Sequence, residues 1–182
     1  MRFLRSSVVV VVMGVVGTIG CATAPKSAEE RSDLEARAAQ TLKTMQDRDP
    51  QLGVLLQNAP AYAVFPSIGK AGLVVGGAHG RGVLYEGGRM TGYVQLNEAS
   101  IGAQAGGQSF AELIVFKDPG MAQKLKGGNF ELSGNASAVA LTAGAAASAQ
   151  FIDGSAVFVM PLGGAMAELS VGGQQIKYVP RG

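Results

Sequence analysis

The sequence predicts an α+β fold: a glycine-rich antiparallel β-sheet, formed as a sandwich or a partly closed barrel, with N-terminal helices and one short inserted helix. Three observations predict it. Residues 29–49 are rich in charged residues and space their apolar side chains as a helix does, glycine rises sharply after residue 58, and the later apolar residues come in short runs or alternate with small ones. The 27 glycines follow no three-residue period and 47% of the residues are hydrophobic, which excludes a collagen-like or a disordered chain.

The first helix is expected over residues 29–49. Its apolar side chains recur at intervals of 4, 4 and 3 residues, which is the helical period. They are Leu34, Ala38, Leu42 and Met45. Glu29 and Glu30 fall in the first turn, where the helix dipole favours acidic side chains. This segment is therefore predicted to pack one apolar stripe against the rest of the protein.

Aspartate followed by proline marks the start of two shorter helices. Asp49 stands before residues 50–57 and Asp118 stands before residues 119–126, and each of these ranges begins with proline. Aspartate is a good N-cap, and proline is favoured in the first helical position because its missing N–H is not needed there. The predicted apolar faces comprise Leu52, Leu55 and Leu56 in the first of these helices and Met121 and Leu125 in the second.

The remaining apolar runs predict strands. They cover residues 61–65, 72–77, 82–85, 91–96, 109–116, 136–149, 155–160, 165–171 and 174–179. Pro66 is expected to stop the first strand, and Gly87-Gly88, Asp153-Gly154 and Gly172-Gly173 are turn signals between strands. Three consecutive apolar residues from Leu113 indicate a strand that is buried on both faces. Residues 136–149 have a composition that also suits a helix, and interruption by glycine favours a strand.

The N-terminal residues resemble an export signal of a bacterial lipoprotein. Arg2 and Arg5 precede a short apolar segment that is too short to span a membrane, and small residues follow it. Cys21, the only cysteine, stands where lipoproteins are cleaved and acylated on sulfur. We therefore expect a signal peptide at residues 1–20, lipid attachment at Cys21 and a tether at residues 21–28. The alternative is an ordinary secretory signal with an incidental cysteine.

This signal sets the expected location and the charge of the mature chain. Ala22 follows the cysteine in place of aspartate, which favours sorting to the outer membrane of the bacterial cell envelope. Arg2 and Arg5 account for the formal charge of +2, so the chain without residues 1–20 is formally neutral. A neutral domain lacks the basic footprint of nucleic-acid-binding proteins.

One cysteine also permits no internal disulfide bond.

Four glycine-rich blocks occur in a fixed order after residue 60: AVFPSIGKAGLVVGGAHGRGVL, SIGAQAGGQSF, LIVFKDPGMAQKLKGG and GGAMAELSVGG. Together they resemble the SYLF domain, a lipid-binding module found in bacteria and eukaryotes, and the resemblance covers residues 50–179. Met160, Pro161 and Glu168 depart from the family pattern. The resemblance implies binding of membrane phospholipids, which are phosphoinositides for eukaryotic members. For a bacterial member we expect phosphatidylglycerol, cardiolipin or phosphatidylethanolamine, with anionic lipids preferred.

Lys70, Arg81 and Arg89 are the basic residues of the glycine-rich block and are the candidate lipid-binding residues. Cationic side chains beside exposed backbone amides provide the chemistry that a phosphate head group requires. The alternative is that all three are ordinary solvated surface charges.

No catalytic, cofactor or metal motif is apparent in the sequence. His79 is the only histidine and has no acidic or cysteine residue at ligand spacing, and neither a G-x-S-x-G elbow nor a phosphate-binding loop occurs. We therefore expect a binding module without cofactor or metal, not an enzyme. Two alternatives are an outer-membrane β-barrel, disfavoured by an aromatic content of 6%, and a structural envelope lipoprotein that contacts proteins or peptidoglycan.

Overall fold

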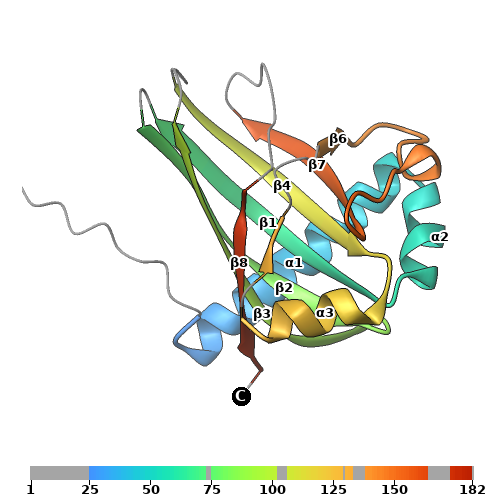
Figure 1. Ribbon diagram of the computed structural model, residues 1–182, viewed down its shortest axis with the longest axis horizontal. Coiled ribbons are helices and arrows are strands. Elements are labelled where there is room, and N and C mark those ends of the chain that lie inside the picture. Colours follow the sequence, from blue (N-terminus) through green and yellow to red (C-terminus); the bar gives the residue numbers. More distant parts are fainter. Residues whose placement is uncertain are drawn as a thin grey trace, which may run out of the picture.

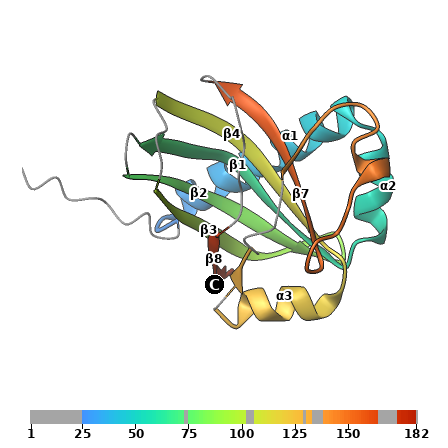
Figure 2. The ribbon, with the colours of Figure 1, turned by 45° about the horizontal axis from the view of Figure 1, so that its top comes forward.

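The computed structural model describes residues 25–72, 75–101, 106–128, 130–132, 138–163 and 173–181, which form an α+β fold. An eight-stranded mixed sheet curls into a half-barrel, two helices cover its outer face, and a third helix lies against its inner side (Figure 1, Figure 2). The predicted fold class and the partly closed sheet are confirmed. The predicted signal, Cys21 and the rest of the first half of the tether lie outside the described residues.

The helices are α1 (Ala28–Arg48), α2 (Gln51–Asn58) and α3 (Pro119–Lys126), with a short 3₁₀ turn η1 (Ala146–Ser148). The strands are β1 (Ala61–Gly72), β2 (Val75–Glu86), β3 (Arg89–Ile101), β4 (Gly106–Phe116), β5 (Phe130–Glu131), β6 (Ala138–Ala140), β7 (Ser155–Gly163) and β8 (Gln175–Pro180). Their order in the sheet is β5-β8-β3-β2-β1-β4-β7-β6. All pairings are antiparallel except β6 with β7, so the expectation of a purely antiparallel sheet is wrong at this edge.

The first helix forms where its periodicity predicts. Ser27 Oγ accepts a hydrogen bond from the Glu30 backbone N–H at 3.0 Å and caps the helix. Its apolar stripe packs on the outer face of the sheet through Leu34, Ala38 and Met45. Tyr93 on β3 also donates a 2.6 Å hydrogen bond to Glu35. The helix is therefore part of the same packed body as the sheet.

Asp49 joins α2 to the segment that follows β6. One carboxylate oxygen accepts from the Gln51 N–H at 3.1 Å, although the helix begins one residue later than predicted, with Pro50 and not Asp49 as its N-cap. The fully buried carboxylate also accepts from the Gly144 N–H at 3.2 Å and from the Ala146 N–H at 2.7 Å. Because these amides bind a side chain, they are not available to a strand ladder. The predicted strand over residues 136–149 is wrong for this reason: in its described part, residues 138–149, only the short strand β6 forms, and a turn and η1 follow it.

The central strands are longer than expected. Strand β1 continues past Pro66 because the register shifts between Val64 and Ser67, and such a bulge accommodates a residue without an N–H. Gly72 pairs with Gly76, so the predicted strand over residues 72–77 belongs to two antiparallel strands. The predicted strand over residues 82–85 is the end of β2.

Glycine permits close approach at one point in these strands. A Cβ at Gly82 would collide with the Val64 carbonyl oxygen and lie 2.8 Å from a carbon of the Phe65 ring. The Phe65 ring therefore packs over the backbone of β2, as expected for glycine inside a strand.

The turns and the other helix follow the sequence closely. Gly87 and Gly88 both have positive φ, 54° and 74°, as a tight hairpin turn between β2 and β3 requires. Asp118 accepts a hydrogen bond from the Met121 N–H and caps α3. Strand β8 forms close to its predicted range, whereas the predicted strand over residues 165–171 lies outside the described residues.

Apolar side chains fill both faces of the sheet. The inner face packs with α3 around the buried rings of Phe65, Phe110 and Phe116. The outer face packs with α1 and α2 through residues that include Leu52, Val64 and Phe158. Consecutive residues of β4 alternate between these two layers, which confirms the predicted burial on both sides: Leu113 and Val115 face the helices, and Ile114 faces the interior.

Candidate anion-binding site

The structure separates the three basic residues that the sequence groups together. Lys70 is on the inner face: it lies two residues after Ile68, whose side chain belongs to the inner core, and successive even positions of a strand share one face. Arg81 is on the outer face, where its guanidinium meets Glu30 of α1. Arg89 is exposed at the hairpin end of β3. The expectation of one basic cluster is therefore wrong.

Lys70 is not positioned to meet a lipid head group. Its Nζ lies 2.7 Å from Glu98 Oε1, and both side chains are only 4% exposed. Gln174 adjoins this pair, because its amide nitrogen lies 3.5 Å from Glu98 and 3.2 Å from Glu112. We call Lys70, Glu98, Glu112 and Gln174 the interior polar group. One nitrogen thus bridges β3 and β4, which are separated by two strands in the sheet. The interior polar group helps to hold the sheet curled.

Glu112 has an unusual protonation state within this interior group. Burial, helped by the nearby charge of Glu98, raises the pKa of its carboxyl to about 8, while the hydrogen bond from Gln174 and the charge of Lys70 act in the opposite direction. The side chain is therefore largely neutral near pH 7. A neutral carboxyl beside the Lys70–Glu98 pair leaves the interior with no net charge, and we assign these residues a structural role.

Arg81, by contrast, lines a cleft of about 400 Å³ between the N-terminal half of α1 and strands β1 and β2. We call it the α1–sheet cleft. Its lining residues are Leu34, Arg37, Ser67, Gly69, His79, Gly80 and Arg81. They include two arginines and the histidine, and no carboxylate is among them.

Strand register and helical spacing build this cleft. Ser67 pairs directly with Arg81, and Gly69 pairs directly with His79, so the two strands present these residues side by side. Arg37 follows Leu34 by three residues on α1, which places both on the side of the helix that faces the sheet. A Cβ at Gly69 would meet no atom within 4 Å, so this glycine leaves the floor of the cleft open.

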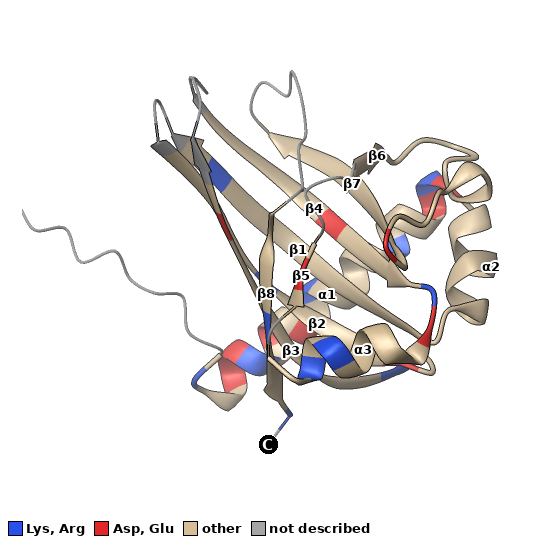
Figure 3. Ribbon diagram, in the orientation of Figure 1, with Lys and Arg blue, Asp and Glu red and all other residues tan. Residues whose placement is uncertain are grey.

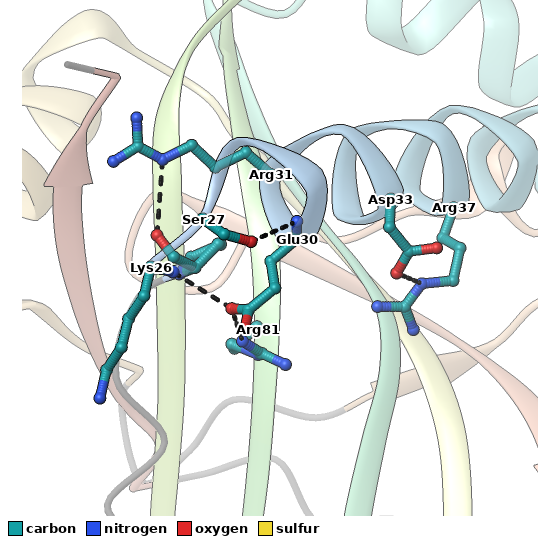
Figure 4. Close-up of polar contacts among 8 residues, drawn as sticks. Lys26, Ser27, Glu30, Arg31, Asp33, Arg37 and Arg81 are labelled. Carbon is teal, nitrogen blue, oxygen red and sulfur yellow. Dashed lines mark hydrogen bonds and ion pairs between the residues drawn. The ribbon is translucent and has the colours of Figure 1, made fainter.

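Each cation of the cleft has a weak, solvent-exposed partner (Figure 4). Arg81 Nη1 lies 3.5 Å from Glu30 Oε2, and Arg37 Nε lies 2.9 Å from Asp33 Oδ2 on the same helix. The arginine side chains are 38% and 50% exposed, respectively, so solvent reaches both. Exposed pairs of this kind contribute about 0–1 kcal/mol each.

His79 completes the polar lining. Its Nδ1 lies 3.0 Å from Asn97 Oδ1 on β3, and in the tautomer that carries the proton on Nδ1 this nitrogen donates to the amide oxygen. Nε2 is then the ring atom left to contact a bound group. Figure 3 shows that α1 carries charges of both signs, so the basic character is local to the cleft and does not extend along the helix.

Sequence reasoning identified Arg81 and missed the other residues of this site. Arg37 and Ser67 carry no motif, and only the packing of α1 on the sheet brings them to Arg81. The sequence also gave no signal for the buried polar residues Glu98, Glu112 and Gln174. A single polar residue in a predicted strand does not indicate which face of the sheet it occupies.

No helix in the part of the chain that the structure describes has the length and apolar character needed to cross a membrane. Within the same ranges, no group of three or more His, Cys, Asp and Glu side chains could hold a metal ion. Neither a protein-family model nor a curated protein matches the chain. The resemblance to the SYLF domain therefore stays a prediction that rests on the residue blocks quoted above.

Proposed function

We propose that this domain binds the phosphate head groups of anionic phospholipids through the α1–sheet cleft, without catalysis, as part of a lipoprotein of the bacterial outer membrane. One observation carries the proposal: Arg37, His79 and Arg81 line one cleft, and the carboxylates that pair with the two arginines, Asp33 and Glu30, are solvent-exposed and not among its lining residues. A guanidinium can bind phosphate oxygens with two parallel hydrogen bonds, which makes arginine well suited to this ligand.

The dimensions of the cleft agree with a head group. Small-molecule sites usually enclose about 300–1,000 Å³, and the cleft, with about 400 Å³, is at the lower end of this range. The Ser67 hydroxyl can donate to a further phosphate oxygen, and Leu34 supplies an apolar wall. A glycerophosphate group can therefore contact cations on one side and an aliphatic side chain on the other.

The predicted lipid anchor would hold the cleft close to a bilayer. Pro25, the first described residue, follows Cys21 by four positions, and a chain of four residues spans at most about 14 Å. Acylation of Cys21 would thus keep Pro25, which stands three positions before the start of α1, within that distance of the membrane surface. The cleft lies beside the N-terminal half of α1, so the cleft and the anchor would contact the same bilayer.

Vesicle flotation tests the proposal with the chain from residue 22 onward, which lacks the anchor and retains every described residue. We expect binding to vesicles that contain phosphatidylglycerol or cardiolipin and little binding to neutral phosphatidylcholine. Each basic residue near an anionic surface contributes about 1 kcal/mol, so the double variant Arg37→Ala/Arg81→Ala should bind roughly 30-fold more weakly.

Arg89→Ala is the matched control, because it removes the same charge from an exposed site at the hairpin end of β3. It should retain most of the affinity. Absence of binding by the unmodified domain would instead favour the structural alternative, in which the lipoprotein acts through protein or peptidoglycan contacts. Equal losses for Arg89→Ala and for either single cleft variant would show that the cleft has no special role.

A further inference from the structure

Glu30 is placed where it can compete with an anion for Arg81. Its Oε2 lies 3.5 Å from Arg81 Nη1 and accepts a 3.1 Å hydrogen bond from the Lys26 backbone N–H (Figure 4). Its own backbone N–H donates to Ser27 Oγ at 3.0 Å. Glu30 therefore does two things at once: its carboxylate accepts from the N–H of the residue before the N-cap at the start of α1, and it pairs with the arginine of the α1–sheet cleft.

The contact with Arg81 is weak enough to be exchanged. Its distance is long for a charge-assisted hydrogen bond, which is usually about 2.7–2.9 Å. The Glu30 side chain is 51% exposed, so water already competes for it. A phosphate group offers more acceptor oxygens than a carboxylate and can take the place of Glu30 at the guanidinium.

We infer that Glu30 is an affinity-limiting residue of the cleft: an anionic head group must displace its carboxylate from Arg81 before it can bind. This inference rests on the proposed function. The consequence is selection by charge. Binding to a neutral or zwitterionic surface does not offset the free energy lost when the Glu30–Arg81 contact breaks, whereas binding to a densely anionic surface does. Glu30 therefore increases the difference in affinity between the two kinds of surface.

Glu30→Gln separates the two roles of this side chain. Glutamine retains an oxygen that can accept from the Lys26 N–H, and the cap formed by Ser27 Oγ uses only the backbone N–H of residue 30, so α1 should remain capped. The charge that holds Arg81 is removed. We therefore expect Glu30→Gln to bind phosphatidylglycerol vesicles about fivefold more tightly than the unmodified chain from residue 22 onward.

Glu29→Gln is the matched control. Glu29 is exposed in the same first turn of α1, and its replacement removes the same unit of negative charge one residue away. It should raise the affinity clearly less than Glu30→Gln, because any general electrostatic gain is shared by both variants. In the Arg81→Ala background, Glu30→Gln should gain no more than Glu29→Gln. Circular dichroism of each variant verifies that the helices are intact.

The outcomes distinguish this inference from the proposal on which it rests. Binding by the unmodified chain with equal gains for the two glutamine variants would overturn the role of Glu30 and leave the lipid-binding proposal in place. A gain for Glu30→Gln that persists without Arg81 would also overturn it. If neither the unmodified chain nor Glu30→Gln binds any anionic vesicle, both the inference and the lipid-binding proposal are wrong.

Discussion

Lys70 and Glu98 form a buried ion pair inside the half-barrel, with 2.7 Å between Nζ and Oε1. The two residues belong to β1 and β3, so the pair reaches across β2, which lies between them in the sheet. Removal of one member would leave an uncompensated charge in a site without access to water. Lys70, which the sequence suggested as a lipid-binding residue, is therefore expected to stabilise the fold.

Lys70→Ala should destabilise the domain by about 3–5 kcal/mol, the usual cost of breaking a buried ion pair from one side. The double variant Lys70→Met/Glu98→Leu should recover much of this loss, because it removes both charges together. Chemical denaturation measures both variants. A loss below about 1 kcal/mol for Lys70→Ala would contradict the structural role of the pair.

The raised pKa of Glu112 predicts a pH dependence of stability. The folded protein holds the proton up to about pH 8, whereas the unfolded chain loses it near its ordinary value of 4.5. Between these values the folded state binds more protons than the unfolded state, so the contribution of Glu112 to stability falls as pH rises, by about 1 kcal/mol per pH unit, and levels off above about pH 8.

Glu112→Gln isolates this effect from other titrating groups. Glutamine carries no proton that titrates, so the difference in unfolding free energy between the unmodified domain and the variant should decrease from about pH 5 to about pH 8. Denaturant unfolding across this range provides the measurement. A difference that stays constant with pH, or that grows, would show that Glu112 is ionised in the folded protein.

Gly82→Ala should destabilise the domain by about 1–3 kcal/mol, because the added Cβ collides with the Val64 backbone and the Phe65 ring. Gly107→Ala on β4 is the control, since a Cβ there would meet no atom within 4 Å. Thermal unfolding should separate the two variants clearly. Equal melting temperatures would mean that the backbones of β1 and β2 are not in close contact at Gly82.

Cys21→Ser tests the anchor that the sequence predicts. A thioether at this cysteine requires its sulfur, so the variant should incorporate no labelled fatty acid and should leave the membrane fraction. Metabolic labelling with a radioactive fatty acid, followed by fractionation, gives the answer. Persistent label on the serine variant would show that the lipoprotein proposal is wrong.

The sequence by itself determined the elements whose signals are local. Asp118 caps α3 because its carboxylate reaches an N–H three residues later, and Gly87 and Gly88 form a turn because glycine adopts positive φ without strain. The helical spacing in α1 and the unbroken apolar run in β4 likewise depend only on neighbours along the chain. Such signals predicted the α+β class and most of the elements.

Tertiary structure alone decided which charges line the cleft and which are buried. Alternation in a strand has a period of two, so a shift of one residue moves every later side chain to the opposite face, and β1 contains such a shift between Val64 and Ser67. The Asp49 contacts with Gly144 and Ala146 also join segments far apart in the chain. The register of the whole sheet and the packing of α1 on it therefore place Lys70 on the inner face and Arg81 on the outer face. No local sequence pattern predicts this difference.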